Sequence, residues 1–286
     1  PKTGQILAMV SSPTFDPRSM IGKLRGKYQR EMTLDPAKPL LNRAIMGQYP
    51  PGSTFKTGQA VTYYSEGVVS DSTRYPCHRG FYFKGLHVGC HPHAAPISLV
   101  PAISTSCNSY FCWGLYHMLS NRKKYKTLED AMDVWRDYMV SMGFGYKLGI
   151  DLPGEKRGMI PNAKFYDNAF KRWNPLSVIS ISIGQGEVNL TPLQIANLGA
   201  TIANRGYYYT PHVVRSIQGK KLDKKYLEKH KSKGTYRSYQ EVIAGMVSSV
   251  RGGTCARAVH PGYTLAGKTG TAQNRGKDHS VFMGFA

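Results

Sequence analysis

The sequence predicts a mixed α/β (α+β) fold, in which an antiparallel sheet from the two ends of the chain packs against a helical body. Strand-like stretches lie near both ends of the chain, and helix-like stretches lie between them. Hydrophobic residues make up 41% of the 286 residues, which is enough for one large core. We therefore expect residues 1–286 to form a single domain, with residues 72–95 as an irregular insert.

The N-terminal part of the chain is expected to contain one strand and one helix. A turn at Pro1–Gly4 leads into a strand at Gln5–Ser11, and a loop rich in proline follows. Pro51 and Gly52 then break the chain, and Lys56–Tyr64 is predicted to be helical. The residues just after this break are therefore expected at a helix N-terminus.

Four further stretches are predicted to be helical. Pro96–Leu119 is expected to be helical in pieces, and Leu128–Met142 has its apolar residues on one face. Thr191 followed by Pro192 is typical of a helix start, and this helix should end near Asn204. Tyr239–Val250 repeats apolar residues at helical spacing, so we expect it to face the core.

The C-terminal part is predicted to be two strands, Tyr263–Gln273 and His279–Ala286, joined by a polar turn at Asn274–Asp278. The strands at both ends of the chain lack a partner on their outer side. We therefore expect the outer strands of the sheet to be missing and the chain to be an internal piece of a longer protein. No run of about 18 apolar residues is present, so no membrane anchor is expected within it.

The formal net charge of +21 suggests an anionic neighbour. Part of this charge is concentrated in one stretch of seven lysines: Lys220, Lys221, Lys224, Lys225, Lys229, Lys231 and Lys233. Almost no aromatic residues alternate with these lysines. The pattern therefore favours a solvated surface segment, and nucleic-acid binding is not expected.

Ser53 and Lys56 form the first of three short motifs that indicate chemistry. A hydroxyl becomes a nucleophile when a base removes its proton and a positive field stabilises the resulting charge. The expected helix N-terminus supplies this field at Ser53, and Lys56 lies one turn further along the same face. Lys56 can act as the base if burial near a second cation lowers its pKa, and Lys268 is the expected second cation.

The second motif is Ser106-x-Asn108. Ser106 can carry a proton between Lys56 and a leaving nitrogen, and Asn108 can hold both Lys56 and a substrate amide. As an isolated pattern the motif is typical of a cap or a turn. Its position between the other two motifs favours the catalytic interpretation.

The third motif is Lys268-Thr269-Gly270, followed by Thr271, in a strand-like stretch. Gly270 would let a substrate backbone lie close to the strand edge. The hydroxyls of Thr269 and Thr271, together with Lys268, would bind a carboxylate. The N–H groups of Ser53 and Thr271 would form an oxyanion hole.

The three motifs together resemble the active-site motifs of penicillin-recognising serine acyltransferases and β-lactamases. Other stretches narrow this resemblance: Pro1–Val10, Gly149–Glu155, Ile183–Glu187, Leu190–Gln194 and Gly270–Gln273. These stretches are similar to the transpeptidase domain of class B penicillin-binding proteins, above all the subgroup that serves side-wall elongation.

The resemblance implies the penicillin-binding/β-lactamase-like transpeptidase fold and peptidoglycan D,D-transpeptidation through a Ser53 acyl-enzyme. It implies stem peptides as substrates, inhibition by β-lactams, no cofactor for the chemistry, and a glycosyltransferase and the elongation machinery as partners. The full-length protein would work at the periplasmic face of the cytoplasmic membrane. Two alternatives remain open: a penicillin-acylated sensor or non-catalytic scaffold, and a serine β-lactamase, for which we find no base that would activate water.

Cys77, Cys90, His93 and Cys107 are candidate ligands of a structural zinc ion. Cys90-x-x-His93 has a spacing that is common in tetrahedral zinc sites, and the resemblance adds that some elongation-type relatives carry zinc close to this site. A disulfide is an alternative, since the expected compartment is oxidising. Free cysteines are another, and the total of five cysteines leaves at least one unpaired. Cys112 and Cys255 are expected to be packing residues.

Overall fold

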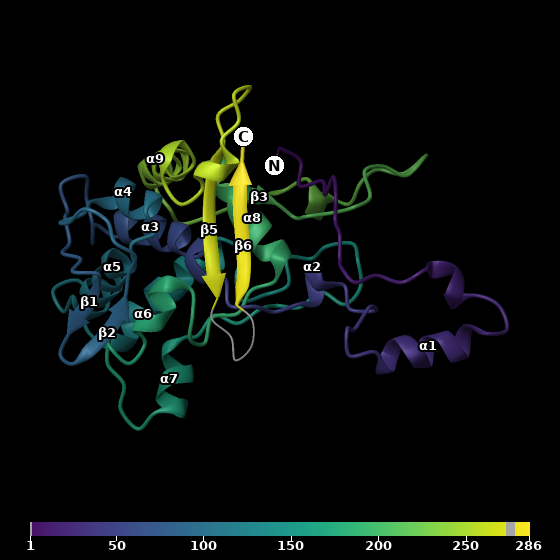
Figure 1. Ribbon diagram of the computed structural model, residues 1–286, viewed down its shortest axis with the longest axis horizontal. Helices are drawn as coiled ribbons and strands as arrows, with labels where there is room; N and C mark the ends of the chain where they lie inside the picture. Colours follow the sequence, from purple (N-terminus) through teal and green to yellow (C-terminus); the bar gives the residue numbers. More distant parts are fainter. Residues whose placement is uncertain (1, 273–277) are drawn as a thin grey trace.

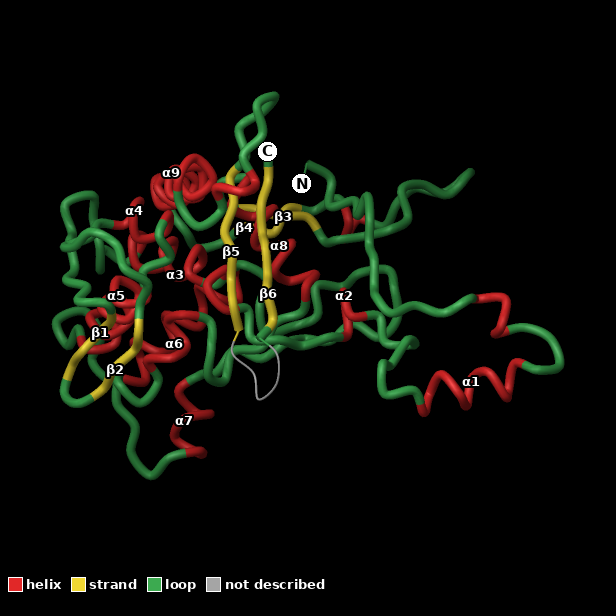
Figure 2. The backbone as a smooth tube through the Cα atoms, viewed as in Figure 1, coloured by secondary structure: helices red, strands yellow, loops and turns green. Residues whose placement is uncertain are grey.

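The computed structural model describes residues 2–272 and 278–286, and helices form most of its regular structure (Figures 1 and 2). The α-helices of the described residues are α1 (Arg25–Leu34), α2 (Arg43–Met46), α3 (Lys56–Ser65), α4 (Leu99–Ser104), α5 (Asn108–Ser120), α6 (Leu128–Ser141), α7 (Ala163–Ala169), α8 (Pro192–Ala203) and α9 (Tyr236–Gly252). Short 3-10 helices lie between them: η1 (Pro17–Met20), η2 (Gly52–Thr54), η3 (Ile179–Ile183), η4 (Lys224–Tyr226) and η5 (Ala256–Ala258).

The strands of the described residues form three separate antiparallel pairs. They are β1 (Gly80–Phe83) with β2 (Leu86–Gly89), β3 (Tyr207–Tyr209) with β4 (Lys229–Lys231), and β5 (Ala266–Ala272) with β6 (His279–Phe285). β5 and β6 run side by side (Figure 1), with Lys268 opposite Met283 and Gly270 opposite Val281. The third sequence motif is therefore held by a regular seven-residue strand.

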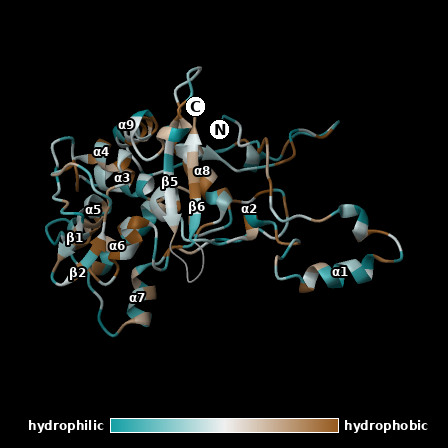
Figure 3. Cartoon of the chain, in the orientation of Figure 1, coloured by the Kyte–Doolittle hydropathy of each residue, from teal (hydrophilic) through white to brown (hydrophobic). Residues whose placement is uncertain are grey.

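The predicted mixed α/β fold and its helical body are confirmed. α3, α6, α8 and α9 occupy the four stretches predicted as continuous helices, and α4 and α5 are the two pieces expected within 96–119. Thr191 begins α8 with a capping box, in which its side chain and that of Gln194 each accept the other's backbone N–H. α8 is apolar over most of its length (Figure 3), and no helix among the described residues is both long and apolar enough to cross a membrane.

The strand predicted at Gln5–Ser11 is wrong. Within this segment the structure has one isolated parallel bridge, between Gln5 and His212, and Leu7 is 94% exposed. Residues of this segment and of β6 line the same cavity of about 1070 Å³, and β6 is paired with β5. The central sheet is therefore built from the C-terminal end of the chain alone. Of the turn predicted at Asn274–Asp278, only Asp278 lies within the described residues.

The insert at residues 72–95 is more regular than expected, because it contains the β1–β2 hairpin. Lys84 and Gly85 form its two-residue turn, and both have positive φ, of 47° and 82°. Such a turn matches the twist of the strands on either side. The remainder of the insert is irregular, as predicted.

α3 passes through the centre of the core, and all its residues from Lys56 to Tyr63 are buried. Two buried hydrogen bonds fix it from behind. The Trp135 indole N–H donates to the Gln59 side-chain oxygen at 2.7 Å, and the Gln59 amide donates to the Ile181 carbonyl at 2.9 Å. Because a buried amide that loses its partner is costly, these bonds join α3, α6 and η3 into a stiff support.

Candidate active site

Ser53 lies in a tight 3-10 turn immediately before α3, as the sequence predicts. Gly52 opens this turn with a φ of +54°, and the Thr54 hydroxyl donates to the Pro51 carbonyl at 2.7 Å. The first backbone N–H groups of the helix are therefore gathered around Ser53, where they favour a developing negative charge.

Lys56 is fully buried, and its ammonium group is directed at the second motif. Lys56 Nζ donates to the Asn108 side-chain oxygen at 2.5 Å and to the Ser106 carbonyl at 2.7 Å, and it lies 3.3 Å from the Ser106 hydroxyl. Ser106 adopts a φ of +58°, a left-handed conformation that is uncommon for a residue other than glycine.

Lys268 is also fully buried and approaches the same hydroxyl from β5. Its Nζ donates to Ser106 Oγ at 2.9 Å and to the Thr269 carbonyl at 2.8 Å. The two ammonium groups thus meet at one oxygen, although their motifs are far apart in the sequence. This is the convergence that the sequence motifs predict.

Burial of the two lysines lowers both pKa values, because it disfavours the charged form. Burial lowers the pKa of Lys56 from 10.5 to about 8. Burial, together with the neighbouring charge of Lys56, lowers the pKa of Lys268 from 10.5 to about 7. A substantial fraction of neutral amine is therefore present near pH 7 to 8, as a general base requires.

β5 packs directly against the turn that carries Ser53. A Cβ atom added to Gly270 would lie 3.0 Å from the Pro51 carbonyl oxygen and 3.2 Å from the Ser53 nitrogen. A Cβ atom added to Gly52 would lie 2.6 Å from the Thr271 carbonyl oxygen. The two backbones can approach this closely only because glycine occupies both positions.

Gly184 holds the other side of the same turn, and sequence reasoning assigned it no role. Its carbonyl accepts the Gly52 N–H at 2.9 Å, and its φ is +73°. A Cβ atom added to Gly184 would lie 2.2 Å from the Gly52 carbonyl oxygen. The turn of Ser53 is therefore clamped between Gly184 and β5. The only sequence signal was the pair Gly184 and Gly186 within a stretch of family resemblance.

The Ser53 hydroxyl makes no hydrogen bond with Lys56 in the described part of the chain, although Lys56 lies one turn further along the chain, because Lys56 is engaged by Ser106 and Asn108. Thr269 and Thr271 alternate with Lys268 along β5 and are more exposed than it. Their binding of a substrate carboxylate remains a prediction.

The four candidate zinc ligands form one cluster. The ligand atoms of Cys77, Cys90, His93 and Cys107 all lie within 4.8 Å of one another. All five cysteines are free, so the structure does not support the disulfide alternative, and Cys112 and Cys255 are buried as expected of packing residues. A hydrogen bond with Cys107 lowers the pKa of Cys90 to about 4, and the same bond and burial raise the pKa of Cys107.

The cysteine cluster is joined to the second motif. Cys107 is the residue between Ser106 and Asn108, and the Asn108 backbone N–H donates to Cys90 Sγ at 3.2 Å. The Asn108 side-chain amide donates to the Gly89 carbonyl at 2.6 Å. Asn108 is therefore held by the insert on one side and by Lys56 on the other.

Comparison with known proteins gives a match along the whole chain. The model for the penicillin binding protein transpeptidase domain matches residues 1–286. The chain is 33% identical over 310 residues to the peptidoglycan D,D-transpeptidase MrdA of Acinetobacter baumannii, covering all of this chain and 44% of that protein. It is 27% identical over 288 residues to MrdA of Escherichia coli, covering 96% of this chain and 43% of that protein.

Solved structures give the same result. Penicillin-binding protein PBP2 of Pseudomonas aeruginosa, in complex with WCK 5153, has a TM-score of 0.84 and 30% identity, with 100% of this chain and 64% of that chain covered. A chain of a peptidoglycan synthase complex that coordinates polymerisation and crosslinking has a TM-score of 0.81 and 32% identity. The match covers 96% of this chain and 45% of that chain.

The chain spans less than half the length of these two MrdA proteins. Within that span, the fold, the three converging motifs and the match over residues 1–286 agree. The chain belongs to the penicillin-binding protein transpeptidase domain family.

Proposed function

We propose that this chain is the catalytic domain of a peptidoglycan D,D-transpeptidase that works through a Ser53 acyl-enzyme. The observation that carries the proposal is the meeting of Lys56 and Lys268 at the Ser106 hydroxyl, at 3.3 and 2.9 Å, beside the turn of Ser53. Two buried amines with pKa values of about 8 and about 7 supply a base near neutral pH.

In the first step Ser53 Oγ attacks the carbonyl of the penultimate D-Ala of a donor stem peptide. Neutral Lys56 takes the hydroxyl proton as the new C–O bond forms. The C–N bond to the terminal D-Ala then breaks, and Ser106 passes a proton from Lys56 to the leaving nitrogen. An amine of a second stem peptide attacks the ester, its proton returns to Ser53, and the cross-link is complete.

The backbone N–H groups of Ser53 and Thr271 are proposed to stabilise the tetrahedral intermediate. β5 and the turn of Ser53 lie close together, since a Cβ atom added to Gly270 would be 3.2 Å from the Ser53 nitrogen. This closeness supports an oxyanion hole shared by the two segments. Thr269, Thr271 and Lys268 are proposed to bind the substrate carboxylate. We propose that Asn108 also binds an amide group of the substrate.

The relatives support the further partners that the sequence predicts. A structure of Helicobacter pylori PBP2 contains MreC, and another relative belongs to a synthase complex that couples polymerisation and crosslinking. We propose that the full-length protein joins a glycosyltransferase and the elongation machinery at the periplasmic face of the membrane, and that β-lactams acylate Ser53.

Intact-protein mass measured over hours after mixing with benzylpenicillin tests the function. A stable adduct on Ser53 supports a transpeptidase. An adduct that is formed and rapidly lost indicates a β-lactamase, and the absence of any adduct indicates a non-catalytic domain. The same measurement on Ser53→Ala should show no adduct.

We also propose that Cys77, Cys90, His93 and Cys107 hold a structural zinc ion. Three thiol groups and one imidazole within 4.8 Å match the donor set of closed structural sites, and Cys77 and Cys107 are buried. When bound, the ion would cross-link the insert to the second motif and would not activate water. The metal content of the purified chain tests this assignment.

A further inference from the structure

Two segments project from the same end of the molecule, shown on the right of Figures 1 and 2. The first, which we call the α1 arm, comprises residues 16–38 and carries η1 and α1. The second, the lysine arm, comprises residues 213–233 and carries η4 and β4. Neither arm contributes a residue to the candidate active site, so both need a separate explanation.

The helix of the α1 arm is exposed over almost its whole length. None of the ten residues of α1 is buried, and isolated helices shorter than about 12–15 residues are only marginally stable in water. Ile21, in the loop before the helix, and Leu34, the last residue of the helix, are each 70% exposed. An exposed helix flanked by exposed aliphatic side chains is typical of a surface that another molecule covers.

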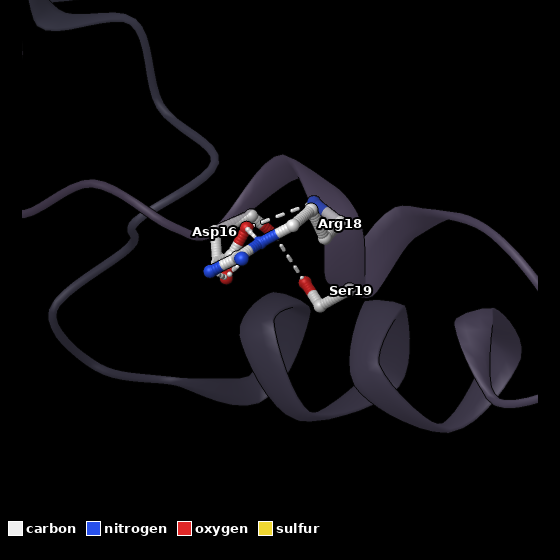
Figure 4. Close-up of polar contacts among 3 residues, drawn as sticks. All are labelled: Asp16, Arg18 and Ser19. Atoms are coloured by element: carbon white, nitrogen blue, oxygen red, sulfur yellow. Dashed lines mark hydrogen bonds and ion pairs between the residues drawn. The ribbon is translucent and has the colours of Figure 1, made fainter.

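The charges of the α1 arm are only partly neutralised within it. The Arg18 guanidinium donates two hydrogen bonds to the Asp16 carboxylate (Figure 4). The Ser19 hydroxyl donates to the backbone carbonyl of Asp16 at 2.6 Å. Lys27 lies 4.0 Å from Glu31. Lys23, Arg25 and Arg30 form no ion pair in the part of the chain that the structure describes. These three cations are therefore available at the surface.

The lysine arm carries a larger excess of charge. Between residues 213 and 233 the sequence has eight lysine and arginine residues against two acidic residues, Asp223 and Glu228. Lys220 and Lys221 are exposed at the tip and form no ion pair among residues 2–272 and 278–286. Ile217, beside them, is 55% exposed.

The two arms have the same kind of tip and a common base. One tip reads Ile21-Gly-Lys-Leu-Arg25 and the other reads Ile217-Gln-Gly-Lys-Lys221, so each presents an exposed aliphatic side chain next to two cations. At the base, a cavity of about 460 Å³ is lined by Phe15 of the segment that leads into the α1 arm and by Val213 of the lysine arm. The two arms therefore leave the body of the domain close to each other.

We propose that the tips of the α1 arm and the lysine arm bind the surface of an anionic lipid bilayer. Lysine and arginine near such a surface are attracted by its negative potential. Exposed isoleucine and leucine side chains next to them gain further by entering the region between headgroups and acyl chains. A soluble acidic polymer would satisfy the cations and leave the aliphatic side chains in water. This inference does not depend on the chemistry of Ser53.

Sedimentation of the chain with lipid vesicles tests the proposal. The vesicles contain phosphatidylethanolamine with or without an equal part of phosphatidylglycerol, at low and high salt. We expect binding only to the anionic vesicles, weakened by salt. The double variant Lys220→Glu/Lys221→Glu should lower the association constant at least about tenfold. The matched control Lys123→Glu/Lys126→Glu changes the net charge equally, at two exposed lysines of the α5–α6 loop, and should bind like the unaltered chain.

The aliphatic half of the proposal needs a second variant. Ile21→Ser/Ile217→Ser keeps every charge and should weaken binding to anionic vesicles at least about threefold. Thermal unfolding of each variant verifies that the fold is retained. If the Lys220/Lys221 variant and the Lys123/Lys126 control lose the same amount of vesicle affinity, net charge alone drives binding. Full binding by the serine variant, with displacement by soluble polyglutamate, would make an acidic polymer the ligand. Either of these results, or no binding to anionic vesicles, overturns the proposal.

Discussion

Lys268 Nζ donates a hydrogen bond to Ser106 Oγ across 2.9 Å, between residues 162 positions apart in the chain. Lys56 reaches the same oxygen from α3 at 3.3 Å. One hydroxyl is therefore shared by two buried amines, and a proton that leaves either of them has a direct acceptor. The proposed proton transfers use this arrangement, and five predictions depend on it or on the structure around it.

Replacement of the proposed base should slow acylation without loss of the fold. Lys56→Ala is expected to lower the rate of acylation by benzylpenicillin by 10²–10⁴-fold, the usual contribution of a positioned proton carrier. Stopped-flow labelling with a fluorescent penicillin measures the rate, and circular dichroism verifies the fold. An acylation rate equal to that of the unaltered chain would remove Lys56 from the mechanism.

The acylation rate should rise with pH between about 7 and 8 and then level off. The reason is that the base acts as neutral amine, and burial lowers the pKa values of Lys56 and Lys268 to about 8 and about 7. Because the two groups interact, the apparent values belong to the pair. A lysine with its ordinary pKa of 10.5 would instead give a rate that still rises above pH 9.

The free energy of unfolding should also respond to these lysines. Their pKa values are lower in the folded than in the unfolded chain, so unfolding takes up protons between about pH 7 and 10.5. The contribution of these two groups to stability therefore increases as the pH rises through that window. Lys56→Met should flatten the dependence measured by urea unfolding, and an unchanged dependence would contradict the folded pKa values.

Gly184→Ala should slow acylation more than alanine does at another glycine of positive φ. The added Cβ would lie 2.2 Å from the Gly52 carbonyl oxygen, so the turn of Ser53 must shift. We expect the acylation rate constant to fall by about 10²-fold, as on removal of one oxyanion donor, with little change in the initial binding of penicillin. Gly149→Ala is the matched control: its φ is +92°, but the added Cβ meets only Thr210, at 3.7 Å. Equal effects of the two variants would argue against a clamp.

Zinc should be lost when one ligand of the cluster is removed. The unaltered chain is expected to contain about one zinc ion, and Cys90→Ser should contain much less and unfold at a lower temperature, because three ligands hold the ion weakly. Cys112→Ser removes a buried cysteine outside the cluster and should keep the metal. Elemental analysis and thermal unfolding check both variants. Equal metal content in Cys90→Ser and the unaltered chain would refute the site.

The sequence predicted the catalytic side chains better than the backbone packing that holds them in place. Ser53, Lys56, Ser106, Asn108 and Lys268 carry functional groups whose type and order are informative. Gly184 has no side chain, and its role depends on how closely two backbones approach after folding. No local pattern contains that information. The hold of Asn108 on Lys56 was predicted, and the additional hydrogen bond from Lys56 to the Ser106 carbonyl depends on tertiary contacts.

The two errors in secondary structure have different physical causes. Gln5–Ser11 has the composition of a strand, but a strand needs a neighbour along its length, and the structure pairs this segment only at the Gln5–His212 bridge. The β1–β2 hairpin was missed because Lys84 stands where Asn or Asp usually marks this type of turn. Gly85 at the next position was the available signal.

Asn108 is held by Cys90 and Gly89, and both belong to an insert that carries none of the three motifs. A substitution that loosens the insert would therefore displace Asn108, and with it the partner of Lys56, while all three motifs keep their sequence.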